Sequence, residues 1–241
     1  YATFRLRTKG DLPPDTAVYI KEARTAYALY CARNLIASSG RVGTTWEPGM
    51  ADLTPRLGKL PADCLKDPEF TLQVSNFDYS LGGPGSPIRI GHHDVLRIAQ
   101  IRRDALSFAL AGILFVMTLY HIVWWLVRIQ DLRNIWFSAL SFLCMLRIIG
   151  TENAIPRLLG PGTFEMQMKV EFLAFYLMIP VSSFFFQSLF PREIHRIFPR
   201  IQAVMAVPFI AATIFLPTRI YSGKNWIYLV AAAIMIVYMI Y

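Results

Sequence analysis

The sequence lacks the residue patterns that most enzyme and metal sites require. It contains no nucleophile elbow, P-loop, dinucleotide-binding fingerprint, HExxH motif or paired-carboxylate motif. Its three cysteines, Cys31, Cys64 and Cys144, form neither a CxxC motif nor a cluster with histidine, which argues against a zinc site. We therefore expect no enzyme activity, no cofactor and no metal ion within these residues.

Charged residues are scarce in the second half of the chain. Of the 24 lysines and arginines and the 16 aspartates and glutamates, 14 and 10 precede residue 104. The net charge of +8 is explained by basic residues that flank membrane spans and contact lipid headgroups. No basic stripe or basic–aromatic module is present in the polar part, so we expect no nucleic-acid partner.

Long apolar runs predict membrane-spanning helices. From Ala105 to Val127 the chain has no Asp, Glu, Lys or Arg. As a helix this run spans about 34 Å, which exceeds the hydrocarbon core of about 30 Å. Further apolar runs lie at 134–150, 172–191, 201–218 and 225–241. We therefore predict a helix bundle over 105–241, with the lipid bilayer as its partner and a multi-pass location in the cell (inner) membrane.

The first 93 residues have the alternation of half-buried β-strands. Ala2, Phe4 and Leu6 alternate with polar residues, and turn-rich segments separate further short strand-like runs. We predict an antiparallel sandwich over 1–93, with strands missing before Tyr1, and a linker over 94–104. Its core is expected to hold six side chains: Phe4, Leu6, Tyr27, Leu29, Leu72 and Val74.

The sequence alone decides neither whether the N-terminal module contains a disulfide bond nor on which side of the membrane it lies. Cys31 and Cys64 can pair if the module lies outside the cytosol, but sequence gives no geometry for the bond. With the module outside, the loops 128–133 and 192–200 are cytoplasmic and hold a slight excess of arginine. Arg97, Arg102 and Arg103 count against that orientation, so charge alone does not decide it.

A known family resembles this chain over nearly its whole length. The stretches that carry the resemblance are 26–40, 42–43, 70–77 and 82–83, the Arg102-Arg103-Asp104 lead-in to the first span, and the Arg128–Arg133 loop. They resemble bacterial seven-transmembrane receptors with diverse intracellular signalling modules. The usual Asn-Gly hairpin is replaced by Ala32-Arg33-Asn34, and two helices and an output module are absent.

The resemblance implies a fold and a signalling role. It implies an extracellular jelly-roll sensor module that is similar to carbohydrate-binding sandwiches. It also implies seven helices, of which five are visible here, and a cytoplasmic histidine kinase, nucleotide cyclase or phosphatase beyond this fragment. A homodimer through the bundle or the output module is a further expectation.

Two loops carry candidate ligand-binding residues: Trp46 in one, and Asn76, Asp78 and Tyr79 in the other. Aromatic faces pack against apolar sugar surfaces while amides bond hydroxyls, so a small polar or carbohydrate ligand fits these loops. The alternative is that Asn76 caps a turn and Phe77 fills the core, and a similar structural role is the alternative for Trp46.

Arg147 and Glu171 lie at edges of the apolar runs that should face the same side of the membrane. Intramembrane ionisable groups are costly and are usually paired, so these two are candidates for a switch. Snorkelling of each side chain to the interface is the alternative. His92 and His93 are neighbours whose side chains diverge, which disfavours a shared metal ion.

The function that follows from these patterns is a membrane sensory receptor. It binds an extracytoplasmic ligand and passes the signal through its helices to an output module. The alternative is a membrane transporter or channel with an extracytoplasmic β domain, which internal prolines such as Pro180 and Pro208 favour weakly.

Overall fold

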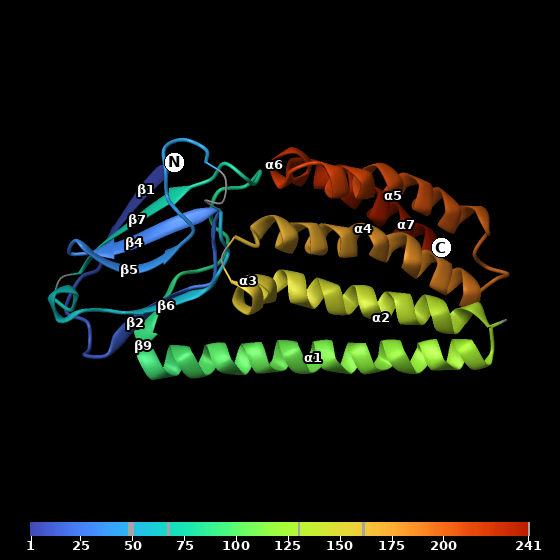
Figure 1. Ribbon diagram of the computed structural model, residues 1–241, viewed down its shortest axis with the longest axis horizontal. Coiled ribbons are helices and arrows are strands. Elements are labelled where there is room, and N and C mark those ends of the chain that lie inside the picture. Colours follow the sequence, from blue (N-terminus) through green and yellow to red (C-terminus); the bar gives the residue numbers. More distant parts are fainter. Residues whose placement is uncertain (48–50, 67, 130, 161, 241) are drawn as a thin grey trace. The chain divides into compact units, whose positions relative to one another are not determined.

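The computed structural model describes residues 1–47, 51–66, 68–129, 131–160 and 162–240 (Figure 1). Tyr241, the last residue of the predicted fifth span, lies outside the described residues. The chain forms two compact units. The first combines Tyr1–Ala105 with Asn153–Gln167, and the second combines Leu106–Glu152 with Met168–Tyr241.

The first unit contains antiparallel β-sheets. One sheet has the order β1 (Ala2–Arg7), β7 (Glu69–Ser75), β4 (Ala26–Cys31) and β5 (Asn34–Ser39). A second has the order β6 (Arg56–Lys59), β2 (Thr16–Ile20) and β9 (Arg89–His92), and β3 (Ala23–Arg24) pairs with β8 (Gly83–Pro84). The predicted antiparallel β module is confirmed, while β3, β6 and β8 are too short to show a periodic pattern.

A single apolar core joins the two larger sheets. It contains Val18 from β2, Tyr27 and Leu29 from β4, and Leu72 and Val74 from β7. Four of the six predicted core residues are therefore buried as expected. Burial also raises the pKa of the Tyr27 hydroxyl above its ordinary value, so this side chain stays neutral.

The prediction that Phe4 and Leu6 are buried is wrong, because 50% and 58% of their surfaces are exposed. Both side chains line an apolar cavity of about 260 Å³, together with Val18 of β2 and Ile90 of β9. They thus face the space between the sheets, as the alternation predicted. However, β1 and β9 are edge strands in the described part of the chain, so no further strand covers the cavity.

The turn between β4 and β5 is tight despite its unusual sequence. Ala32 and Arg33 both have positive φ angles, 45° and 73°, and Cys31 pairs with Asn34 across the turn. Two central residues with positive φ define the turn type that Asn-Gly normally favours. The hairpin therefore forms without glycine, with non-glycine residues in a sparsely populated backbone region.

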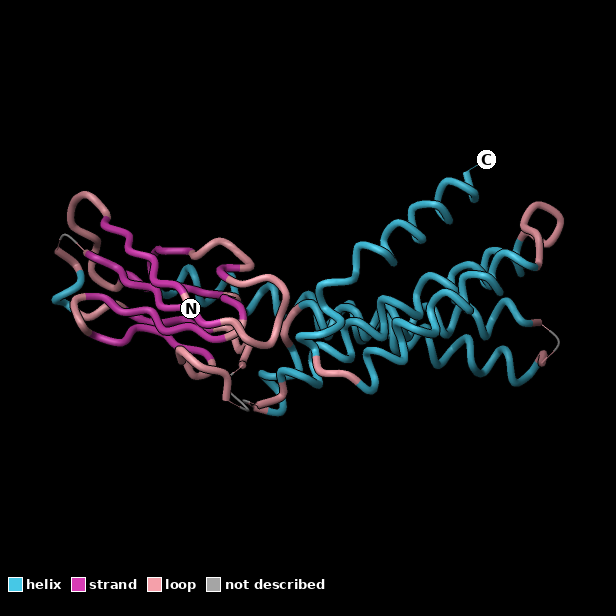
Figure 2. Tube along the Cα trace, turned by 90° about the horizontal axis from the view of Figure 1, so that it is seen from above, coloured by secondary structure: helices cyan, strands magenta, loops and turns pink. Residues whose placement is uncertain are grey.

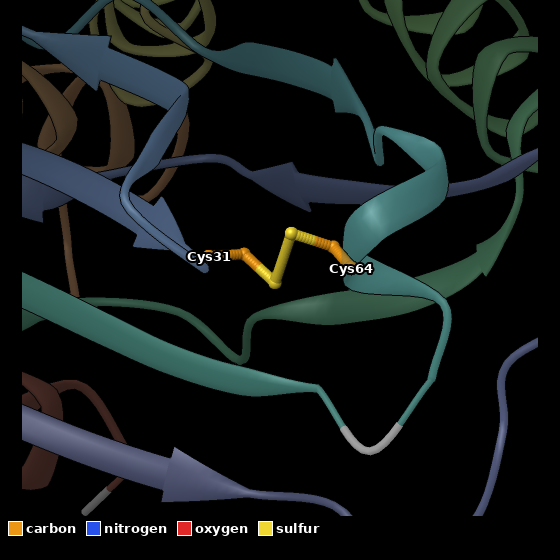
Figure 3. The surroundings of a disulfide bond; sticks show 2 residues. All are labelled: Cys31 and Cys64. Atoms are coloured by element: carbon orange, nitrogen blue, oxygen red, sulfur yellow. A yellow bond between two sulfur atoms is a disulfide. The ribbon is translucent and has the colours of Figure 1, made fainter.

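Cys31 and Cys64 form a disulfide bond, which resolves the pairing that the sequence left open (Figure 3). Cys31 ends β4, and Cys64 lies in the short 3-10 helix η1 (Ala62–Cys64). Both residues are buried in the apolar core. The bond closes a chain segment with a sequence separation of 33 residues and fixes η1 to the larger sheet.

Helices make up most of the remaining chain. They are α1 (His93–Val127), α2 (Leu132–Thr151), α3 (Ala154–Leu159), α4 (Phe164–Leu189), α5 (Ile197–Phe215), α6 (Thr218–Tyr221), the 3-10 helix η2 (Ser222–Lys224) and α7 (Asn225–Ile240). Four of them, α1, α2, α4 and α5, are long and apolar enough to cross a membrane. The predicted combination of a β module and a membrane helix bundle is confirmed. α7 begins where the fifth span was predicted, and 16 of its residues are described.

Residues 94–104, which were expected to link the two parts, form the first turns of α1. All helices are drawn in cyan in Figure 2. The segment contains neither Gly nor Pro, so nothing in it interrupts the helix that continues into the first span. The β module is thus joined to the bundle by a continuous helix rather than by a loop.

Hydrogen bonds and an aromatic stack connect neighbouring helices of the second unit. The Ser138 hydroxyl of α2 donates to the Thr118 carbonyl of α1 at 3.1 Å. Trp136 of α2 stacks on Phe184 of α4, with ring centroids 4.6 Å apart. The buried Tyr228 hydroxyl of α7 donates to the Tyr176 carbonyl of α4.

Removing the disulfide should destabilise the β module. Replacing both Cys31 and Cys64 with alanine should lower the free energy of unfolding by about 3–4 kcal/mol, because an open chain loses more entropy on folding. Urea-dependent proteolysis of the full chain in detergent would measure this. Cys144→Ala is the matched control, since Cys144 is a free cysteine in α2. An unchanged urea midpoint in the double variant would contradict the structural role of the bond.

Candidate functional site

The loop after β7 holds three of the predicted ligand-binding residues. The Asn76 side-chain amide donates to the Tyr79 carbonyl at 2.8 Å, and the Tyr79 amide donates to the Asn76 side-chain oxygen at 3.2 Å. A Cβ atom on Gly82 would lie 3.0 Å from the Asn76 side-chain nitrogen. Asn76 therefore closes the loop on itself, as the turn-capping interpretation expected.

Trp46, which lies in another part of the chain, contacts this loop through a hydrogen bond. Its indole N–H donates to Asp78 Oδ1 at 2.9 Å, and 47% of its surface is exposed. The Gly43 amide also donates to the Ser75 hydroxyl at 3.3 Å. The two candidate loops therefore lie at the same end of the module, with the Trp46 ring accessible.

Two charged residues that the sequence did not single out complete the cluster. The Arg24 guanidinium carbon lies 4.7 Å from the centre of the Tyr79 ring, a distance typical of a cation–π contact. Arg24 also forms an ion pair with Glu22 at 3.3 Å. Arg24 pairs with Gly83 between the short strands β3 and β8, which places it beside the loop. The two strands are too short for the sequence to have revealed this position.

The arrangement combines chemical groups that suit a polar ligand. Trp46 offers an exposed ring, Tyr79 a half-buried ring, and Asp78, Glu22 and Arg24 offer charged hydrogen-bonding groups. Rings pack on apolar faces of a ligand, and the polar groups fix its orientation. The cluster is thus equipped for binding. We refer to these residues, with Asn76, as the loop cluster.

In the second unit, Arg147 and Glu171 form an ion pair between α2 and α4. Arg147 Nη1 donates to Glu171 Oε1 at 3.0 Å and to the Glu171 carbonyl at 3.3 Å. The guanidinium carbon also lies 5.5 Å from the centre of the Phe175 ring. A Cβ atom on Gly150 would lie 3.0 Å from Glu171 Cβ, so the helices approach closely here. A role of this pair as a switch remains a prediction.

His92 ends β9 and His93 begins α1, where His93 Nδ1 lies 3.1 Å from Asp94 Oδ1. Within the described ranges, no three His, Cys, Asp or Glu side chains are grouped closely enough to hold a metal ion.

Comparison with known proteins gives one match. A family model described as 7TM diverse intracellular signalling matches residues 103–241. The matched segment covers more than half of the chain and includes nearly all of the helical part. No match was found among curated proteins or among solved structures.

The contact between Arg147 and Glu171 is open to a double-mutant cycle. Arg147→Gln or Glu171→Gln alone leaves one charge without its partner, so each should lower the thermal stability of the detergent-solubilised chain. The double variant should be more stable than the sum of the single effects predicts, by a coupling energy of about 0.5–3 kcal/mol.

Glu165→Gln provides the control for this cycle, since Glu165 lies in the first turn of the same helix. The change in stability caused by Glu165→Gln should simply add to the change caused by Arg147→Gln. If the changes caused by Glu171→Gln and Arg147→Gln were also additive, Arg147 and Glu171 would not interact energetically.

Proposed function

Because the chain belongs to the family of seven-transmembrane proteins with diverse intracellular signalling, we propose that it is a sensory receptor whose β module binds a small polar ligand. The observation that carries this proposal is the loop cluster, in which Trp46 and Asp78 are in contact although 32 residues separate them. A multi-pass membrane protein with such a cluster has the two parts that a receptor needs, a ligand site and a path across the membrane.

The ligand that best fits the loop cluster is sugar-like. A sugar presents apolar C–H faces and ring hydroxyls, which match an exposed indole and nearby carboxylates. Asp78 accepts from Trp46 and retains its second carboxylate oxygen for a ligand hydroxyl. Asn76 supports the site by holding the Tyr79 backbone in place.

The ligand site is proposed to lie outside the cytosol. The Cys31–Cys64 disulfide supports this location, because such bonds persist in oxidising compartments and are rare in the cytosol. The arginines of the loops 128–133 and 192–200 then lie on the cytoplasmic side, as the positive-inside rule favours.

The proposed signal path starts from the composition of the first unit. That unit includes Asn153–Gln167, which contains α3 and the first residues of α4. Within it, Arg157 forms an ion pair with Asp104 of α1. A rearrangement of the β module therefore acts on the beginnings of both α1 and α4. α4 continues to Glu171 and its contact with Arg147.

Such a path works only if the ligand binds two arrangements of the helices with different affinities. The formed and broken states of the Arg147–Glu171 pair are the two proposed arrangements. The helices would pass the change to an output module, for which a kinase, nucleotide cyclase or phosphatase is expected from the family. The transporter alternative gains little support, since α4 and α5 continue as helices through Pro180 and Pro208.

Ligand binding can be tested with the full chain in detergent and a panel of neutral mono- and disaccharides. Trp46→Ala and Asp78→Ala should each weaken binding of an active saccharide about tenfold. The first variant loses the ring that packs on the sugar, and the second leaves a ligand hydroxyl without its acceptor, at a cost of about 1–3 kcal/mol. Isothermal titration calorimetry measures the affinities. Leu35→Ala is the control, since Leu35 is an exposed apolar residue of β5 outside the cluster.

Two outcomes would contradict the proposed site. One is binding of no saccharide in the panel by the wild-type chain. The other is a saccharide whose affinity is unchanged in both Trp46→Ala and Asp78→Ala, which would place its site elsewhere.

A further inference from the structure

A pocket of about 910 Å³ opens among the ends of α1, α2, α4 and α5 in the second unit. Four arginines line it, Arg128, Arg133, Arg196 and Arg200. Arg128 lies in the connection between α1 and α2, and Arg133 lies in the first turn of α2. Arg196 lies in the connection between α4 and α5, and Arg200 lies in the first turn of α5. The fold thus gathers cationic side chains around one cavity instead of distributing them around the bundle.

The charge of the pocket is poorly balanced by its own residues. Asp131 is the one carboxylate among the described lining residues, and its Oδ1 accepts from the Arg133 amide at 3.1 Å and from Arg133 Nε at 3.0 Å. The Arg133 backbone N–H and then its guanidinium lower the pKa of Asp131 below the ordinary value. No described carboxylate forms an ion pair with Arg128, Arg196 or Arg200.

Two helix N-termini add to the positive potential. α2 begins at Leu132 and α5 at Ile197, and residues of both first turns line the pocket. The helix dipole at such ends favours an anion. Backbone and side chains therefore act in the same direction here.

One wall of the pocket is apolar. Trp136 and Phe184 stack with their planes 11° apart and are half-buried, and exposed Val127 and Leu132 lie beside them. A pocket with a cationic rim and an aromatic wall accepts a molecule that has a charged head and an apolar tail. Its volume lies within the range of about 300–1,000 Å³ that is usual for small-molecule sites.

The lining residues come from the ends of four helices that are able to cross a membrane, so they lie at the level of the lipid headgroups. We propose that this pocket is a binding site for the phosphate headgroup of an anionic glycerophospholipid. Arg128, Arg196 and Arg200 bind the phosphate, and the acyl chains pass along the Trp136–Phe184 wall. Basic pockets between membrane helices bind anionic headgroups in this manner.

Lipid binding can be measured by native mass spectrometry of the full chain in detergent micelles. Phosphatidylglycerol should be retained at least about tenfold more strongly than phosphatidylcholine, and Arg196→Gln and Arg200→Gln should each reduce that preference about fivefold. Arg192→Gln is the matched control, because Arg192 lies in the same connection but does not line the pocket. Replacing Arg196 and Arg200 with lysine should keep most of the preference, since the charge remains.

A second readout reports the position of the lipid. Phosphatidylglycerol with brominated acyl chains should quench tryptophan fluorescence in the wild-type chain, and part of that quenching should disappear in Trp136→Phe. In a third arm, glycerol phosphate without acyl chains is added in excess. It should displace the lipid only weakly, because it lacks contact with the aromatic wall.

Three results would overturn the proposal. The first is equal retention of the two lipids. The second is an equal loss of preference in Arg192→Gln and Arg200→Gln, which would indicate a diffuse charge effect. The third is binding of glycerol phosphate as tightly as the lipid, which would identify a soluble phosphate compound as the ligand.

Discussion

Hydrocarbon offers no hydrogen-bond partners, so polar groups within the helix bundle have to satisfy one another. Ser138 donates to the backbone of α1, Tyr228 donates to the backbone of α4, and Arg147 pairs with Glu171. Breaking any of these contacts costs free energy, because no water is present to replace the missing partner. A side chain at Gly150 would also press against Glu171 of α4, because its Cβ atom would lie 3.0 Å from Glu171 Cβ. These contacts therefore favour one arrangement of the helices over arrangements that would separate the partners.

In the proposed mechanism the β module acts on the bundle through the chain itself, because no loop separates β9 from α1. Its last strand is followed directly by α1, and Asn153–Gln167 belongs to the same compact unit. The Arg157–Asp104 ion pair ties these two segments together inside that unit. We propose that a ligand which reshapes the loop cluster acts on both of these segments. Glu171 lies four residues after the last residue of α4 that belongs to this unit, Gln167, and in this proposal its ion pair with Arg147 is the first contact affected.

Sequence patterns predicted the parts of the fold that depend on local periodicity. Alternation predicted β1, and charge-free runs predicted the long helices, because strand burial and bilayer thickness leave a regular signal. The prediction that Phe4 is buried failed, because its burial depends on whether another strand covers β1. The contact of Trp46 with Asp78 joins loops 32 residues apart, and no local pattern reports such proximity. Arg147 and Glu171 were paired by a physical rule, namely that charges in a membrane seek partners.

The central claim is that ligand binding at the β module changes the arrangement of α2 and α4. Spin labels on cysteines at Phe142 of α2 and Leu189 of α4, both exposed positions, report their separation by double electron–electron resonance in a Cys144→Ala background. The account predicts that a saturating saccharide shifts the distance by about 1–2 Å, as in other interfacial helix movements, and that Arg147→Gln abolishes the shift. Identical distance distributions with and without a ligand that calorimetry shows to be bound would contradict it.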